Sequence, residues 1–129
     1  MWPAARSIAA ALLALASAAA SAAPQPPGAT RAELERWLTA NAGAGATEPR
    51  RWQYAFSAPA SASLEALSLQ LVEAGFAIRT LGPRAAGGAE LMVTRLELHT
   101  PATLERRSRE LAGLARAHAA RYDGIDIAP

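Results

Sequence analysis

Few side chains in this sequence have the chemistry that catalysis or metal binding requires. The 129-residue chain contains no cysteine, which excludes a disulfide framework, a thiolate metal site and a thiol nucleophile. Its two histidines, His99 and His118, are expected on different elements, with no carboxylate at the spacing of a metal site. We therefore predict no metal site and no cofactor.

Both histidines are predicted to have structural roles. His99 ends the expected third strand, beside a loop in which a histidine is more often solvated than catalytic. His118 falls on the leucine face of the expected last helix, where it would be partly buried with a hydrogen-bond partner.

The other candidates for acid–base chemistry are Asp123 and Asp126, close to the C-terminus. A strand places these two positions on opposite faces, so they are not expected to form a catalytic pair. Asp123 is expected to accept hydrogen bonds from backbone amides in a turn at Asp123-Gly124, and Gly124 to provide a conformation that a Cβ would block. No Gly-x-Ser-x-Gly elbow is present. We predict no catalytic residues and no enzymatic activity.

The charge balance does not indicate a nucleic-acid partner. The formal net charge is only +2, and all thirteen basic residues are arginine. Domains that bind single-stranded RNA on a sheet stack bases on aromatic residues of the first and third strands. The expected third strand, ELMVTRLEL, has no aromatic residue. RNA binding remains an alternative that the sequence does not favour.

The first 22 residues resemble a secretory signal peptide. Arg6 precedes an apolar stretch, residues 7–17, that is too short to cross a bilayer. Small residues follow, and cleavage is expected near Ala22. The protein is therefore expected to be exported, to a periplasm or to the medium, with no stable membrane span after cleavage.

A linker, residues 23–49, is expected to contain one short amphipathic helix at residues 30–41. Thr30 and Glu33 have the spacing of a capping box, and Leu34, Trp37 and Leu38 would share one face. A helix this short is marginal alone in water, so we expect it to dock on the main domain.

The main domain is expected to span residues 50–129. Trp52, Tyr54 and Phe56 alternate with smaller residues, as in a half-buried strand. A helix capped by Ser61 or Ser63 should run to about Ala74, with Ala74 on its inner face, and a short strand follows. A strand at residues 90–99, a helix capped by Thr100 and a closing strand at about residues 122–127 complete the order. The order strand–helix–strand–strand–helix–strand predicts a ferredoxin-like α+β fold: a four-stranded antiparallel sheet with two helices on one face.

A surface for protein contacts is expected on the sheet face opposite the helices, with Gln53 and Arg95 exposed there. Trp37 and Leu69 are weaker candidates, since Leu69 points away from the inner face of its helix. About 80 residues make a small core, so self-association is an alternative source of additional buried surface.

From Arg50 onward the sequence resembles the regulator of ribonuclease E activity B family, RraB. The resemblance is carried by Phe56-Ser57-Ala58, Leu64-Glu65 and residues 73–78 (EAGFAI), and towards the C-terminus by Leu111, Leu114-Ala115 and the motif Tyr122-Asp123-Gly124. Ile125 stands where the family commonly has Trp, and the helix at residues 30–41 is expected to lie outside the resemblance.

The resemblance implies a non-enzymatic regulator that acts by binding a protein. The family's founding member is a cytoplasmic protein that binds and inhibits an RNA-degrading endonuclease. An exported copy could not meet that nuclease, so the expected partner is an unidentified protein. Ribonuclease E inhibition is the alternative if the chain stays in the cytoplasm.

Overall fold

A computed structural model describes residues 29–42 and 48–128 of the chain. The predicted signal peptide lies outside these residues. The elements are α1 (Arg31–Ala42), β1 (Arg50–Ala58), α2 (Ser61–Glu73), β2 (Ala77–Pro83), β3 (Ala89–Glu97), α3 (Pro101–Ala117) and β4 (Arg121–Ile127). None of the described helices is long and apolar enough to cross a membrane.

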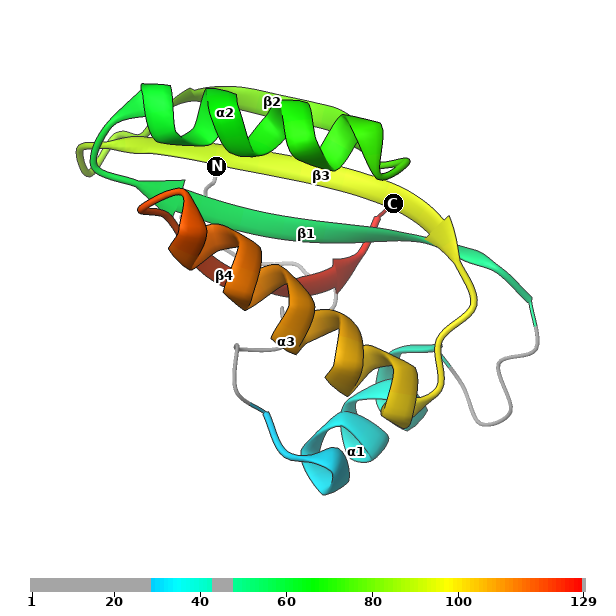
Figure 1. The fold of residues 1–129 in the computed structure, drawn as a ribbon. Coiled ribbons are helices and arrows are strands. Elements are labelled where there is room, and N and C mark those ends of the chain that lie inside the picture. Colours follow the sequence, from blue (N-terminus) through cyan, green and yellow to red (C-terminus); the bar gives the residue numbers. More distant parts are fainter. Residues whose placement is uncertain (1–28, 43–47, 129) are drawn as a thin grey trace.

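The four strands form one antiparallel sheet in the order β2-β3-β1-β4 (Figure 1). This order confirms the predicted ferredoxin-like fold, with β1 and β3 in the centre. Each edge strand contains a register shift, between Ile78 and Thr80 in β2, and in β4 opposite Ala55 and Phe56 of β1.

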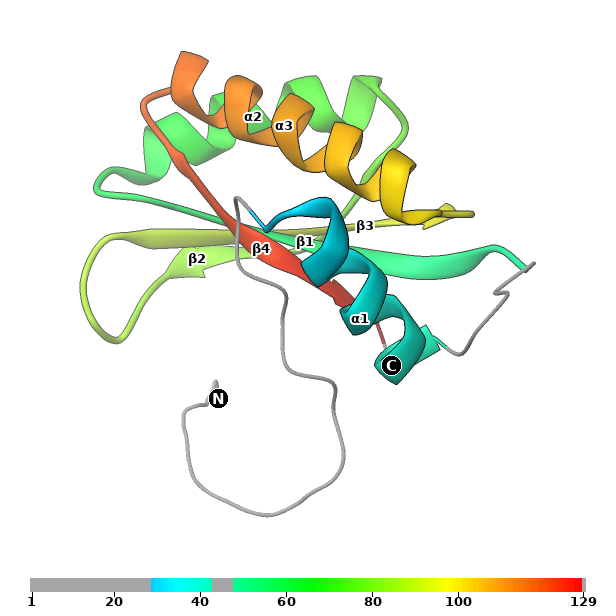
Figure 2. The ribbon, with the colours of Figure 1, turned by 90° about the horizontal axis from the view of Figure 1, so that it is seen from below.

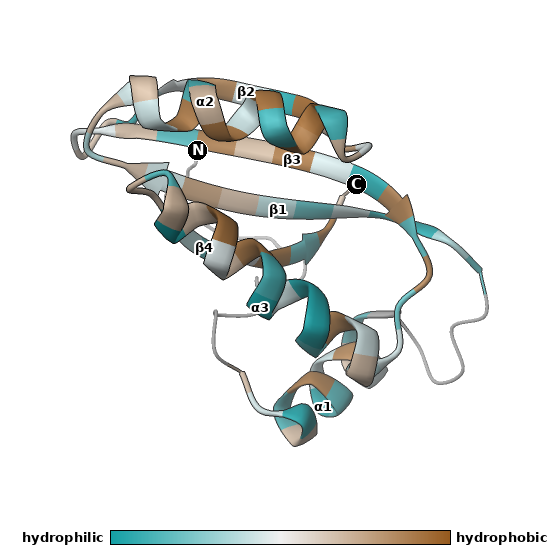
Figure 3. Ribbon diagram, viewed as in Figure 1, coloured by the Kyte–Doolittle hydropathy of each residue, from teal (hydrophilic) through white to brown (hydrophobic). Residues whose placement is uncertain are grey.

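Helices α2 and α3 lie on the same face of the sheet (Figure 2). The predicted aromatic face of β1, Trp52, Tyr54 and Phe56, is buried beneath them, together with Leu91 and Val93 of β3. The helices contribute a set of leucines to this core: Leu64, Leu67, Leu71, Leu104 and Leu111. Most of β3 and α2 is apolar, whereas α3 carries several strongly hydrophilic residues (Figure 3).

Helix α3 begins as the sequence predicts, and α2 does not. Thr100 accepts a hydrogen bond from the Thr103 amide, and Pro101 occupies the first helical position. The N-cap of α2 is Ala60, which offers no side-chain cap, so the predicted serine cap is wrong. Strand β1 continues to Ala58, which leaves only two residues for the connection and brings Ser61 inside the helix.

Helix α1 packs into the same core. Leu34 and Leu38 are buried, and the indole rings of Trp37 and Trp52 lie 6.1 Å apart. Arg31 forms an ion pair of 2.7 Å with Glu105 of α3. The predicted docking of this helix is therefore confirmed, as is its capping box, in which the Thr30 and Glu33 side chains each accept from the other's amide.

Candidate functional site

His99 lies at the centre of a buried polar cluster, where it was expected to be solvated. Its side chain is only 4% exposed. Its Nε2 atom lies 2.9 Å from Glu97 Oε1 and 3.0 Å from the Tyr54 hydroxyl, and its Nδ1 atom lies 2.9 Å from the Thr103 hydroxyl. The Trp52 ring packs edge-on against the imidazole, with 5.2 Å between centroids.

Glu97 is the acceptor that holds this cluster together. Its Oε1 atom accepts a hydrogen bond of 2.5 Å from the Tyr54 hydroxyl, and its Oε2 atom forms an ion pair with Arg107. Arg107 also contacts Glu110 at 2.5 Å, and Arg95 Nε approaches Glu97 Oε2 at 3.6 Å. The carboxylate is thus surrounded by donors from β1, β3, α3 and the β3–α3 connection.

These contacts determine the protonation states within the cluster. Burial by itself would raise the pKa of Glu97, but hydrogen bonds from His99, Arg107 and Tyr54 outweigh it and lower that pKa to about 2. Burial, followed by the hydrogen bond to Glu97, raises the pKa of Tyr54 far above its ordinary value. Burial would lower the pKa of Arg107, yet its pairing with Glu97 raises it. The cluster therefore contains an ionised Glu97, a charged Arg107 and a neutral Tyr54 at neutral pH.

The geometry favours a structural role for the cluster. A carboxylate with a pKa of about 2 is a weak base, and a phenol with a raised pKa is a weak nucleophile. Within the described part of the chain, no group of three or more His, Cys, Asp or Glu residues could hold a metal ion. The cluster ties the end of β3 to α3. The signal for it in the sequence was the Glu97-x-His99 spacing, which places both side chains on one side of an extended chain.

His118 follows the last residue of α3 and serves as its C-cap residue. Its Nε2 atom lies 2.7 Å from Gln70 Oε1, so it links the two helices near their ends. It is partly buried with a hydrogen-bond partner, as predicted, but it lies outside the apolar core.

The motif Tyr122-Asp123-Gly124 lies within β4, and the predicted turn at Asp123-Gly124 is wrong. Asp123 is the extra residue of a β-bulge, since Tyr122 pairs with Phe56 and Gly124 pairs with Ala55. Asp123 accepts a 2.9 Å bond from the Arg121 side chain instead of backbone amides. Gly124 has φ +145°, which supports the predicted need for a glycine. The motif therefore sets the register of the closing strand.

The face of the sheet opposite α2 and α3 carries no aromatic residue on its two central strands. Pairing places Gln53 and Ala55 of β1 beside Thr94 and Met92 of β3 on this face. Arg79 donates a 2.9 Å hydrogen bond to Gln53 Oε1 across the intervening strand. This face lacks the stacking platform that a sheet-type RNA-binding domain requires.

The four residues proposed for protein contact do not converge. Gln53 lies on the face of the sheet opposite α2 and α3, as predicted. Arg95 lies on the helix-bearing face, which corrects the prediction: it pairs with Trp52, donates to the Ala74 carbonyl at 2.7 Å and lies over the Phe76 ring. Trp37 packs against Trp52 in the docking of α1.

Of the four proposed contact residues, Leu69 is highly exposed, with 70% of its surface accessible to solvent. Val72, Ile78 and Leu81 are also exposed. Leu69 and Val72 are one helical turn apart on the exposed surface of α2. Ile78 and Leu81 of β2 pair with core residues of β3, so they lie on the face of the sheet that carries α2. Ala74, predicted to face inwards, is exposed at the end of this helix. We refer to Leu69, Val72, Ile78 and Leu81 as the α2–β2 edge.

Comparisons with known proteins identify a family for the chain. No curated protein matches it. The family model described as "Regulator of ribonuclease activity B", RraB, matches residues 35–126, which is more than half of the chain. The match begins within α1, so this helix is not outside the family domain as the sequence suggested. It also includes the Tyr122-Asp123-Gly124 bulge. The chain belongs to the RraB family.

Proposed function

We propose that this protein is a non-enzymatic regulator that acts by binding another protein. The observation that carries the proposal is the RraB match over residues 35–126, because the family is described by its regulation of ribonuclease activity. The Glu97 cluster supports it, since its carboxylate, imidazole, phenol and guanidinium groups are engaged with one another.

The α2–β2 edge is the contact surface that the geometry favours. Of the six exposed large hydrophobic residues in the described part of the chain, four belong to α2 and the edge strand β2 that follows it. Exposed apolar groups that cluster in this way mark protein-contact sites, whereas isolated ones are ordinary. The partner would place apolar side chains against this edge.

The compartment determines which partner is accessible. The leader-like residues 1–22 support export, and an exported protein requires an exported partner. Retention in the cytoplasm would make ribonuclease E the partner to test. A fusion to a reporter that is active only outside the cytoplasm, made with and without residues 1–22, distinguishes export from retention in the cytoplasm. Activity that depends on residues 1–22 is the expected result.

Cross-linking and pull-down from extract of that compartment test the contact surface. We expect Leu69→Glu and Val72→Glu to abolish capture of a partner that the wild type retains. Leu96→Glu is the matched control, because Leu96 is a similarly exposed leucine, at 61%, outside the α2–β2 edge. Equal loss with Leu96→Glu, or full capture by both edge variants, would contradict this surface.

A further inference from the structure

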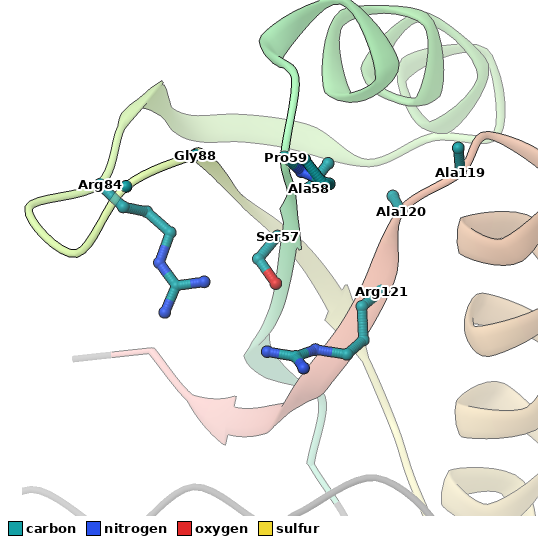
Figure 4. Close-up of a pocket in the computed structure, with 9 residues that line it drawn as sticks. Ser57, Ala58, Pro59, Arg84, Gly88, Ala119, Ala120 and Arg121 are labelled. Atoms are coloured by element: carbon teal, nitrogen blue, oxygen red, sulfur yellow. The ribbon is translucent and has the colours of Figure 1, made fainter.

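A depression of about 530 Å³ lies at the end of the sheet where the β2–β3 hairpin, the end of β1 and the α3–β4 connection meet. Ser57, Arg84 and Arg121 provide its polar groups, and Ala58, Pro59, Gly87, Gly88, Ala119 and Ala120 complete its lining. Figure 4 shows the two guanidinium groups extending towards the same space from opposite sides, with the Ser57 hydroxyl between them. The depression is open to solvent.

Ser57 is the first indication that the depression binds something. The residue is 5% exposed, and its side chain points into the space between the two arginines (Figure 4). Its hydroxyl has no hydrogen-bond partner among the described residues. The hydroxyl oxygen itself is reached by solvent, so it is free to donate a hydrogen bond to a ligand in the depression.

The two arginines give the depression a positive charge. Arg84 is partly buried and forms no ion pair within the described part of the chain. Arg121 uses its Nε atom to contact Asp123, which leaves its two terminal nitrogens for another acceptor. Glu90 pairs with Ser57 across the sheet but forms no ion pair with either arginine.

The surrounding backbone holds these groups in place. Gly88 has φ +76°, and a Cβ there would lie 2.7 Å from the Ala58 carbonyl oxygen, so only glycine lets the hairpin pack this closely against β1. Ala119 has φ +56° and turns the chain from α3 into β4 just before Arg121.

We propose that this depression binds an oxyanion of the phosphate class, held between Arg84 and Arg121, with Ser57 donating a hydrogen bond. Donors approach from two strands and a hairpin, which suits a tetrahedral anion whose oxygens point in several directions. A planar carboxylate would be satisfied by one guanidinium fork. The anion could be free phosphate or a phosphoryl group on a larger ligand, and the two share this chemistry.

Titration calorimetry and amide chemical-shift mapping of the full chain, with inorganic phosphate as the probe, test the proposal. We expect saturable binding with a Kd of about 1 mM or below, with shifts confined to the end of β1, the hairpin and the α3–β4 connection. Arg84→Gln and Arg121→Gln should each weaken binding about tenfold, and Ser57→Ala about threefold. Arg79→Gln is the matched control, because Arg79 is an arginine on the sheet outside this depression.

The outcomes separate the possible ligands. Tighter binding of a phosphoserine peptide than of phosphate identifies an esterified phosphoryl group, and equal binding identifies the free anion. Equal binding of acetate and phosphate would overturn the proposal, as would unsaturable binding or an equal loss with Arg79→Gln. Thermal melting of each variant excludes loss of the fold, and Ser57→Ala, which removes one oxygen only, provides a second test if an arginine variant unfolds.

Discussion

Glu97 combines with His99, Tyr54 and Arg107 in contacts that no single stretch of sequence contains. The carboxylate is favoured in its ionised form because these donors outweigh the cost of its burial. Breaking such a cluster leaves Arg107 partly buried without its carboxylate. The hydrogen bonds and the ion pair of Glu97 therefore contribute to folding stability.

The pH dependence of stability follows from the lowered pKa of Glu97. That pKa is about 2 in the folded state, against an ordinary value of 4.5. The stabilisation is therefore complete above about pH 5 and is lost as the pH falls from 5 to 2. We expect Glu97→Gln to lower the free energy of unfolding by about 1–2 kcal/mol at pH 7, since solvent screens part of the interaction. Urea denaturation across this pH range measures the effect.

Glu110→Gln is the control for this prediction. Glu110 contacts the same arginine, but its side chain is 55% exposed, so we expect its loss to cost less than about 0.5 kcal/mol. A stability difference between wild type and Glu97→Gln that stayed constant from pH 7 to pH 2 would contradict the assignment.

At the scale of elements, α2 and α3 end in the same way with different residues. In each, the amide two positions beyond the C-cap residue returns to a carbonyl of the last turn, from Phe76 to Leu71 and from Ala120 to Ala115. The residue between them has positive φ: Gly75 at +100° and Ala119 at +56°. Glycine adopts positive φ readily, whereas alanine is strained there.

Two substitutions at these helix ends should have opposite effects. Ala119→Gly relieves the strain of a Cβ at positive φ and should raise the free energy of unfolding by about 0.5–1 kcal/mol. Gly75→Ala introduces that strain and places a Cβ 3.4 Å from the Arg95 guanidinium carbon. It should lower the free energy of unfolding by about 1 kcal/mol or more. Thermal melting of both variants measures this. Destabilisation by Ala119→Gly would refute the interpretation of the α3 end.

Periodicity predicted the elements well, because it reports which side chains are buried. Trp52, Tyr54 and Phe56 alternate, and all three are buried. Contacts between residues far apart in the sequence could not be predicted from periodicity. Arg95 was placed on the wrong face, since the strand's two faces both carry apolar residues and its contacts with Ala74 and Phe76 come from elsewhere in the chain. The bulge at Asp123 depends on pairing with β1, so a local pattern suggested a turn.

For the molecule as a whole, α1 belongs to the hydrophobic core. Leu34 is 2% exposed and packs with the residues beneath α3. We expect Leu34→Ala to lower the free energy of unfolding by about 2–4 kcal/mol, because it leaves a cavity in this core. Urea denaturation followed by circular dichroism measures the change.

Glu35→Ala, on the exposed side of the same helix, should change stability by less than about 0.5 kcal/mol. If Leu34→Ala were equally silent, the helix would not be part of the folding unit.

Both edges of the sheet carry a bulge, at Arg79 in β2 and at Asp123 in β4. Bulges interrupt the ladder that another chain would extend and so protect edge strands from aggregation. Association of this molecule is therefore expected through side chains, as at the α2–β2 edge, more than through added strands.

The contact between Trp37 and Trp52 also provides an optical signal. The chain has three tryptophans, and in a protein that begins at residue 23 these two are the only ones. Their rings lie 6.1 Å apart across the junction of α1 with β1. Intrinsic fluorescence and near-ultraviolet circular dichroism of that form would report directly on the docking of α1, with no added label. A partner that displaced this helix would reveal itself by a change in tryptophan emission.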